Sequence, residues 1–282
     1  MIESSDLGRD RLSSFFAAFD VAAQQVAPAA ANLILTGQEQ VTGQEQVLRS
    51  LVFLPHGPGA HDGEGEVLAA VRIDFGGREN PLVAALPSRV ELAFEAAPTL
   101  RAIAELLAIE ASARRCGRQV ALDNLCRLLL LLLLRHMIDR GTTQPGLLAG
   151  LSHPQLFPAL VAMQDAPARD WRVDDLATIA GMSRTRFMTL FPRVVGATPM
   201  AYLAGWRMVL ARRELERGGL VKLVARRIGY GSAAAFSRAY QRAFGEPPVA
   251  RRHGRRAEEG TSSRPAEAER GPVRSQYLPS SA

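Results

Sequence analysis

Apolar residues in the last third of the chain recur at helical spacing in two separate stretches. The first stripe consists of Phe187, Leu190, Phe191 and Val194, and the second of Phe236, Ala239, Tyr240 and Ala243. In both stripes the members stand at positions i, i+3, i+4 and i+7, which places them on one side of an α-helix. The pattern therefore predicts two amphipathic helices, each with one buried face.

The residues around the two stripes form a repeat. The first copy has Ser183, Phe187, Phe191, Gly196 and Pro199, and the second, 49 residues later, has Ser232, Phe236, Tyr240, Gly245 and Pro248. Upstream, residues 177–181 are echoed by residues 225–229 at an offset of 48, and Gly231 accounts for the extra residue. Each copy reads as a short helix, a glycine turn, a serine N-cap and a second helix.

This order of elements is the signature of a helix-turn-helix motif. Capped amphipathic helices also occur in other compact helical bundles, so one copy alone would leave both interpretations open. Two copies with matched spacing and basic polar faces favour DNA binding. We expect the motifs at about 173–195 and 221–244.

A long helix over 199–217 is expected to join the motifs. Thr198 is a suitable N-cap, and Pro199 fits the first helical position, where its missing N–H is not needed. At about 1.5 Å per residue the helix is roughly 28 Å long, which is close to one turn of DNA, about 34 Å. The second helices of the two motifs would then enter successive major-groove segments on one face of a duplex.

Short apolar runs separated by Gly and Pro characterise the first hundred residues. The clearest runs are 51–54 and 67–75, on either side of a Pro/Gly-rich stretch. They predict strands of a small barrel or sandwich over 1–97. The hexamer Thr-Gly-Gln-Glu-Gln-Val stands twice in tandem over 36–47, which is more typical of a slipped insertion in an exposed hairpin than of a functional element.

Two helices, at 98–115 and 118–140, are expected after the strands. The second is leucine-rich around most of its circumference, so it forms either the core of the N-terminal domain or a dimer seam. A short linker is expected over 142–151, followed by the opening helix of the C-terminal domain. Residues 253–282 are rich in Arg, Glu, Ser, Pro and Gly, a composition that predicts a disordered tail.

The net charge of +6 is distributed unevenly along the 282 residues. Residues 1–170 carry 14 basic and 19 acidic groups, whereas residues 171–252 carry 15 basic and 5 acidic groups. A basic module beside an acidic one indicates a polyanionic partner for the module alone.

The cysteine content and the apolar runs argue for a cytoplasmic protein. Its two cysteines, Cys116 and Cys126, are expected to be unpaired and buried, with a redox switch as the alternative. The start of the chain lacks the apolar region of a secretory signal. The longest leucine run, 128–134, is far shorter than the roughly 20 residues of a membrane helix.

A dense set of motif residues fills the region from Trp171 to Arg252. They are Leu176-Ala177, Gly181-Met-Ser183, Arg186-Phe187, Phe191, Gly196, Thr198-Pro199-Met-Ala-Tyr-Leu203, Trp206-Arg207-Met208, Ala211-Arg212, Ile228-Gly-Tyr230, Ser232, Ala235-Phe236-Ser-Arg238, Gly245 and Pro247-Pro248. With these residues the region resembles the DNA-binding domain of the AraC/XylS family of transcription regulators.

The resemblance implies an α+β protein in which a small cupin-like β-barrel with two helices precedes an all-α double helix-turn-helix domain. Its expected divisions are a sensor domain at 1–97, a helical dimerisation segment at 98–141, the linker at 142–151, the DNA-binding domain at 152–252 and the tail. Residues 80–87 resemble the exit from such a barrel. The barrel looks short for a full ligand pocket.

The polar faces of the two recognition helices supply the candidate base contacts. They are Arg184, Thr185, Arg186 and Thr189 on the first helix, and Ala234, Ser237 and Arg238 on the second. The family resemblance implies base-edge positions at Thr185, Thr189, Ala234 and Arg238, with Arg186 nearby. Because arginine to guanine is the commonest specific contact, Arg238 is the best single candidate. Pro192 departs from the family pattern and is expected to kink the first helix.

The candidate phosphate contacts are all arginines of the basic module. They are Arg172, Arg193, Arg207, Arg212, Arg226, Arg227 and Arg242. As a set they should make DNA affinity fall steeply with salt, although any one of them could simply line a solvated face.

These expectations amount to a transcription regulator that binds promoter or operator DNA and responds to a small-molecule effector. RNA polymerase and a second copy bound through 98–140 are further expected partners. We expect neither catalytic residues nor a metal or cofactor. The alternatives are a cupin-type metalloenzyme using His56, His61, Asp62 and Glu64, and an architectural DNA binder without an effector.

Overall fold

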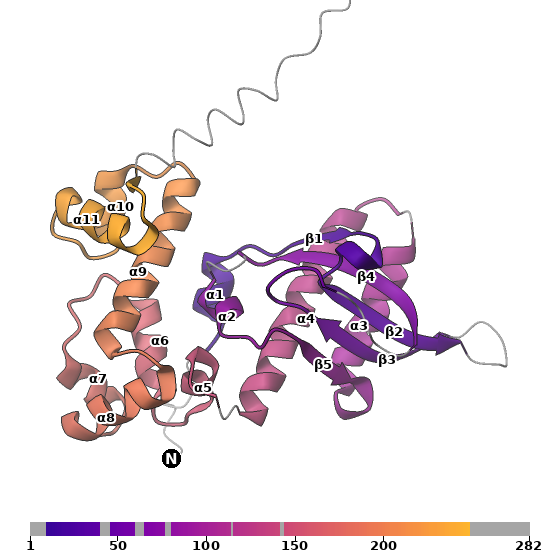
Figure 1. Ribbon diagram of the computed structural model, residues 1–282, viewed down its shortest axis with the longest axis horizontal. Helices are drawn as coiled ribbons and strands as arrows, with labels where there is room; N and C mark the ends of the chain where they lie inside the picture. Colours follow the sequence, from indigo (N-terminus) through magenta and orange to yellow (C-terminus); the bar gives the residue numbers. More distant parts are fainter. Residues whose placement is uncertain are drawn as a thin grey trace, which may run out of the picture.

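The computed structural model describes residues 10–39, 46–59, 65–76, 80–113, 115–141 and 144–248. A curved sheet with two long helices forms the N-terminal part, and a group of shorter helices arranged around one long helix forms the C-terminal part (Figure 1). The α+β class expected from the sequence is therefore confirmed. The tail predicted over 253–282 lies outside the described residues.

The sheet has five antiparallel strands in the order β1-β4-β2-β3-β5. Their bounds are β1 Ala22–Gln25, β2 Leu33–Glu39, β3 Gln46–Phe53, β4 Glu66–Asp74 and β5 Val90–Ala93. The described residues of the tandem hexamer, 36–39 and 46–47, lie in β2 and β3, which pair with each other, and residues 40–45 lie outside the described residues. In the described chain the sheet is open, with β1 and β5 at its edges.

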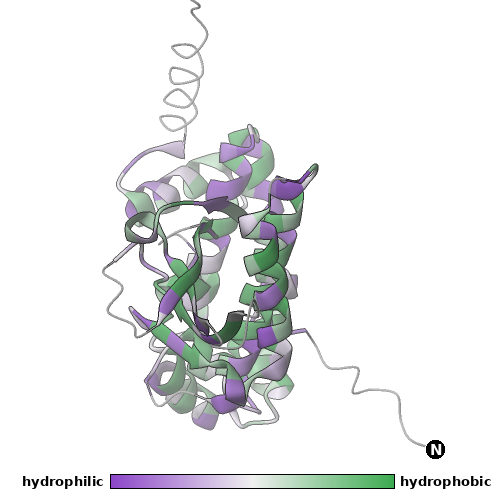
Figure 2. Ribbon diagram, turned by 90° about the vertical axis from the view of Figure 1, so that its right-hand side faces the viewer, coloured by the Kyte–Doolittle hydropathy of each residue, from purple (hydrophilic) through white to green (hydrophobic). Residues whose placement is uncertain are grey.

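One face of the sheet packs against two helices, α3 Pro98–Ser112 and α4 Arg118–Arg140. Alternate residues of the strands point to this face, and Leu33, Leu35 and Val71 are fully buried there. Figure 2 looks onto this end of the molecule and shows strands and helices side by side, with hydrophobic residues in both. The predicted helix at 118–140 is confirmed to the residue, and the one at 98–115 ends three residues early.

Short elements flank the sheet. Before the sheet the chain forms α1 Ser13–Ala18, which is followed by β1, and a 3₁₀ turn, η1 Pro28–Ala30, leads into β2. The expected barrel exit contains α2 Pro81–Ala84, followed by β5 and the 3₁₀ turn η3 Phe94–Ala96. Asn80 is fully buried, and its Oδ1 accepts a hydrogen bond from the Leu82 N–H (2.9 Å), which caps α2.

The structure differs from the expected linker over 142–151. Residues Leu147–Ser152 form a helix, α5, whose leucines are buried between α4 and the first helix-turn-helix motif. A Cβ on Gly150 would stand 2.8 Å from a methyl group of Val195 and 2.7 Å from one of Leu160, so a larger residue there would force these side chains to shift. As a result, the two parts of the protein share one continuous hydrophobic core.

The C-terminal part begins with α6 Phe157–Asp165, a few residues later than expected. The first motif consists of α7 Val173–Ile179 and α8 Arg184–Val195, and the second of α10 Val221–Arg227 and α11 Ala233–Phe244. The connecting helix, α9 Pro199–Glu216, runs between them with one motif at either end (Figure 1). In the described residues no helix has both the length and the apolar character that a membrane span requires.

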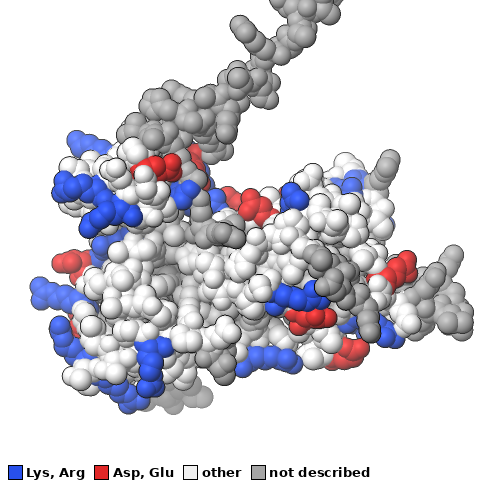
Figure 3. Space-filling view, in the orientation of Figure 1, with Lys and Arg blue, Asp and Glu red and all other residues white. Residues whose placement is uncertain are grey.

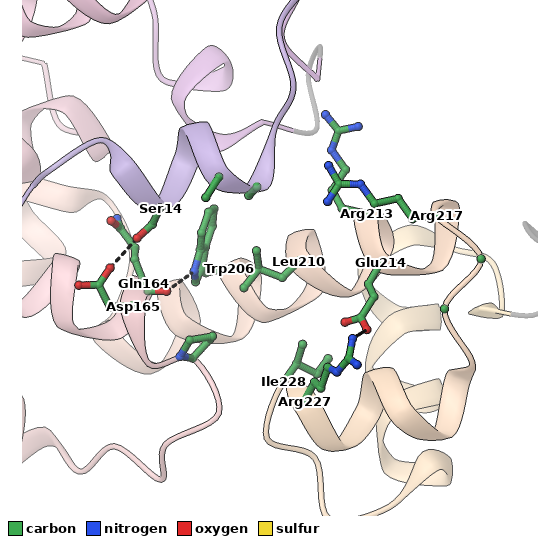
Figure 4. Close-up of a pocket in the computed structure, with 15 residues that line it drawn as sticks. Ser14, Gln164, Asp165, Trp206, Leu210, Arg213, Glu214, Arg217, Arg227 and Ile228 are labelled. Atoms are coloured by element: carbon green, nitrogen blue, oxygen red, sulfur yellow. Dashed lines mark hydrogen bonds and ion pairs between the residues drawn. The ribbon is translucent and has the colours of Figure 1, made fainter.

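The N-terminal segment touches the C-terminal helices directly. Phe15 packs on Trp206 with ring centroids 4.9 Å apart, Arg213 lies 4.3 Å above the ring of Phe19, and Arg217 pairs with Asp20 at 2.7 Å. Figure 4 shows the groove of about 820 Å³ that these contacts border, between α1, α6, α9 and α10. The N-terminal domain therefore contacts α9 at the middle of the helix and at its C-terminal end.

Candidate nucleic-acid interface

The two motifs are closed by the same local interactions. The Ser183 hydroxyl accepts a hydrogen bond from the Arg186 N–H at 3.3 Å, and the Ser232 hydroxyl accepts one from the Ala235 N–H at 3.1 Å. Both recognition helices end at a left-handed glycine, Gly196 or Gly245. The repeat seen in the sequence is thus a repeat of caps and turns, and it fixes α8 and α11 at equivalent places in their motifs.

An aromatic pair anchors each recognition helix to its motif. Phe187 and Phe191 of α8 are fully buried with ring centroids 5.3 Å apart, and Phe236 and Tyr240 of α11 are fully buried at 5.6 Å. The apolar stripes predicted from the sequence are therefore the buried faces, and the polar faces point outward.

The outward faces carry the residues predicted to contact DNA bases. The exposed ones are Arg184, Thr185, Arg186, Thr189, Ala234 and Arg238, whereas Ser237 is half-buried. Both α8 and α11 lie along one edge of the module, where Figure 3 shows Lys and Arg side chains gathered. The structure thus presents both recognition helices on the same side of α9.

The arginines of α8 are engaged within the protein. Arg184 Nη1 lies 2.6 Å from a carboxylate oxygen of Asp174, and Arg186 Nη2 donates to Gln155 Oε1 at 3.3 Å. On α11, Arg238 has no hydrogen bond or ion pair with any described residue. Arg184 and Arg186 are therefore held by partners within the protein, whereas Arg238 is not held by any described residue.

Five predicted phosphate contacts are exposed: Arg172, Arg193, Arg226, Arg227 and Arg242. The other two, Arg207 and Arg212, are half-buried and make contacts within the protein. Arg207 donates to the carbonyl oxygens of Pro167 and Arg169, Arg212 lies 4.5 Å above the ring of Phe244, and Arg227 pairs with Glu214. Burial lowers the pKa of Arg207. Arg207 and Arg212 therefore contribute to internal packing, whereas Arg227, like Arg184, is exposed and paired with a carboxylate.

The repeat also points to a basic residue that the site prediction left out. Lys222 is exposed at the start of α10, and at the offset of 48 it corresponds to Asp174 in α7. The two motifs thus carry opposite charges at equivalent positions. Aligning the two copies residue by residue would have singled out this difference.

Pro192 does not end the first recognition helix. The helix continues to Val195, and the Pro192 carbonyl accepts the N–H of Gly196 at 2.9 Å. The bond from residue 192 to the Met188 carbonyl is missing, because proline has no N–H.

Of the four residues of the metalloenzyme alternative, His56 alone lies within the described residues. His56 Nε2 lies 3.1 Å from the Leu86 carbonyl oxygen, and His61, Asp62 and Glu64 lie outside the described residues. No cluster of three His, Cys, Asp or Glu side chains suited to a metal occurs within the described ranges.

Both cysteines are free; Cys116 is exposed, contrary to expectation, whereas Cys126 is buried, and burial raises its pKa to about 12.

Two helix-turn-helix motifs on one long helix, behind a cupin-like sheet, define a double helix-turn-helix protein. Family models agree: residues 176–253 match a helix-turn-helix domain and residues 22–139 match a cupin domain. The resemblance to the AraC/XylS family is thereby confirmed, and the chain pairs an AraC-type helix-turn-helix domain with a cupin domain.

Individual proteins show the same likeness. The chain is 34% identical over 174 residues to the HTH-type transcriptional regulator AlkR of Acinetobacter baylyi, covering 60% of this chain and 57% of AlkR. It is 38% identical over 128 residues to a putative AraC-like transcription regulator of Streptomyces lividans, covering 45% and 42%. It thus spans about half the length of the curated relatives it matches.

Among solved structures, the DNA-binding domain of AdpA, crystallised with a target DNA, is 30% identical to this chain. The match covers 36% of this chain and 93% of that domain, with a TM-score of 0.34.

Proposed function

We propose that the protein is a sequence-specific DNA-binding transcription regulator of the AraC type, which acts in the cytoplasm on promoter or operator DNA. The observation that carries this proposal is the matched pair of capped recognition helices on one basic edge, one at either end of α9. The names of the relatives, which are transcriptional regulators, support the same conclusion.

The length of α9 suits two successive major-groove segments. Its 18 residues span about 27 Å at ~1.5 Å per residue, and consecutive major-groove segments on one face of DNA are about 34 Å apart. On this proposal α8 and α11, held at the two ends of α9, reach the same face of a duplex.

Base reading and phosphate binding fall to different residues in this proposal. Arg238 reads a guanine edge, and Thr185, Thr189 and Ala234 contact neighbouring bases. Arg184, Arg186 and Ser237 complete the reading surface. The exposed arginines Arg172, Arg193, Arg226 and Arg242 neutralise phosphates and fix the orientation on the duplex.

The N-terminal domain is proposed to control DNA binding in response to a small-molecule effector. Its contacts with α9 give it a physical route, because α9 carries both motifs. An effector that binds one arrangement of the two domains more tightly than another would shift their populations. The regulator would then reach RNA polymerase while bound at the promoter.

A homodimer through α3 and α4 is the second part of the proposal. Leu106 and Ile109 lie on one side of α3 and are 52% and 51% exposed, and Val120 of α4 is 65% exposed. Large exposed apolar side chains on neighbouring helices are typical of an interface. Sedimentation at several protein concentrations tests this, with Leu106→Arg expected to shift the protein toward the monomer.

Selection of bound fragments from genomic DNA, followed by competition against unrelated DNA, tests the central proposal. We expect one fragment class to be retained, and its affinity should fall steeply with salt, by about 0.9 logarithmic units per contacted phosphate per tenfold change in salt. Arg242→Ala should reduce that slope by roughly one unit. Arg89→Ala, in the N-terminal domain, is the matched control and should leave the slope unchanged. Equal retention of all DNA would remove the claim of sequence specificity.

A further inference from the structure

The two motifs belong to two different hydrophobic cores. The aromatic anchors of α8 lie in the large core that also holds the sheet. Those of α11 lie in a smaller core with Met208, Ala211 and Leu215 of α9. Leu210 packs against both cores. Apolar packing therefore attaches the second motif to the rest of the protein only through the C-terminal end of α9. Other contacts must help to fix the position of α11 relative to α8.

Polar contacts from the middle of α9 supply a second link. Arg207 Nε donates to the Pro167 carbonyl at 2.6 Å, and Arg207 Nη2 donates to the Arg169 carbonyl at 2.9 Å. The neighbouring Trp206 Nε1 donates to the Gln164 carbonyl at 3.3 Å. Two adjacent residues of α9 thus hold the end of α6 and the 166–170 loop, which leads into the first motif.

The same loop touches the turn of the second motif. Gly229 has φ +86°, and a Cβ there would stand 2.7 Å from the Ala168 oxygen and 2.9 Å from its Cα. The equivalent turn residue of the first motif, Gly181, has φ +63° but no atom within 4 Å of an added Cβ. A left-handed turn explains glycine at both positions, and backbone contact with the loop is a second requirement at Gly229 alone.

The loop is itself a rigid element. The Ala166 carbonyl accepts hydrogen bonds from the Arg169 N–H (3.2 Å) and from Trp171 Nε1 (2.9 Å), and Trp171 is almost fully buried. Arg169 lies 4.1 Å above the Trp171 ring. Position 168 is therefore fixed relative to the first motif, and any element that abuts it is fixed as well.

We propose that Arg207, the 166–170 loop and Gly229 form a brace that sets the separation and orientation of α8 and α11. The planar guanidinium can bond two carbonyl groups at once, which the single ammonium of lysine cannot do in the same geometry. Arg207 is thus a positioning residue for DNA recognition and not a phosphate contact. By fixing the separation of α8 and α11, the brace also fixes the spacing between the two DNA segments that the protein reads. This consequence for recognition rests on the proposed function.

A distance measurement without DNA tests the brace by itself. Spin labels at Met188→Cys on α8 and Gln241→Cys on α11, both exposed positions, report the separation of the helices when Cys116 is replaced by serine. Cys126 is fully buried and stays unlabelled. The full-length protein should give one narrow distance distribution, and both Arg207→Lys and Arg207→Met should widen it at least twofold.

Two matched controls separate the brace from general damage. Arg226→Met removes an exposed arginine from the same module and should leave the distribution narrow. Gly229→Ala should shift or widen the distribution, whereas Gly181→Ala carries the same backbone strain without the loop contact and should not. If Arg207→Lys and Gly229→Ala, as folded proteins, keep the wild-type distribution, the brace is overturned.

The effect on recognition is measured on the selected DNA fragment with one or two base pairs inserted between the contacted segments. Wild-type affinity should fall at least tenfold on insertion, and that of Arg207→Lys less than threefold. Identical spacing dependence in the two proteins would contradict the proposal. If the wild type selects no fragment, the proposed function fails, and the distance measurement still decides whether the brace exists.

Discussion

The two helix-turn-helix motifs have the same caps, turns and aromatic anchors, yet they are attached to the protein in different ways. The first motif packs on α5, and through it joins the hydrophobic core of the sheet. The second packs on the end of α9 around a small core of its own. The two motifs therefore repeat each other in sequence and fold, but they are not attached to the N-terminal domain in the same way.

The difference bears on the proposed regulation, because it shows how each motif is attached to the N-terminal domain. The first motif is a rigid extension of that domain, because α5 buries its leucines between α4 and α8. Among the described residues the second motif has no such helix beneath it; the contacts with the N-terminal domain on this side come from the C-terminal end of α9, where Arg217 pairs with Asp20 and Arg213 covers Phe19. Regulation through this contact would have to act on the brace of Arg207, the 166–170 loop and Gly229, because that brace is proposed to set the position of α11 relative to α8.

Truncating one aromatic anchor in each motif gives the largest expected effect. Replacing a buried Phe by Ala costs about 3–5 kcal/mol. Phe236→Ala should therefore unfold α10 and α11 locally, because their core is small, whereas Phe187→Ala should destabilise the whole protein. Hydrogen exchange resolved by segment measures both, and alkylation of buried Cys126 reports opening of the large core. Loss of protection in the sheet of Phe236→Ala would show that the cores are one unit.

A second comparison concerns the arginines of the two recognition helices. Arg238→Ala should weaken specific DNA binding by about 1–3 kcal/mol and leave non-specific binding nearly unchanged. Arg184→Ala should cost less, because its guanidinium must first leave Asp174. Titration of each variant against the selected fragment and against unrelated DNA checks this. Equal losses on both kinds of DNA would make Arg238 a phosphate contact.

The smallest expected effect comes from the contact between Asp20 and Arg217. Both side chains are largely exposed, so removal of the pair by Asp20→Asn should lower overall stability by less than about 1 kcal/mol. It should nevertheless speed hydrogen exchange in α10 and α11 more than elsewhere. Glu91→Gln breaks an exposed pair with Arg89 within the N-terminal domain and serves as the control. The same exchange pattern in both variants would argue against a tether on the second motif.

Much of the C-terminal domain could be predicted because its signals are local. Ser183 and Ser232 lie three residues from the N–H groups that they cap, and the aromatic anchors lie one helical turn apart. Such spacings are visible in the sequence itself. The bounds of α4 were predictable for the same reason, since Gly117 and Gly141 flank an uninterrupted leucine-rich stretch.

The features that escaped prediction depend on partners far away in the chain. α5 has six residues, too few to be stable without packing, and its stretch therefore looked like a linker. Arg207 looked like a phosphate contact because the carbonyls it binds lie 40 and 38 residues before it. The exposure of an arginine cannot be deduced from its place in a basic segment.

Hydroxyl-radical footprinting of the full-length protein on its selected fragment tests the central claim most directly. If α8 and α11 occupy successive major-groove segments, two protected regions should appear on one face of the duplex, about 10 base pairs apart. A single protected region, or two regions on opposite faces about 5 base pairs out of phase, would contradict the paired arrangement of the recognition helices.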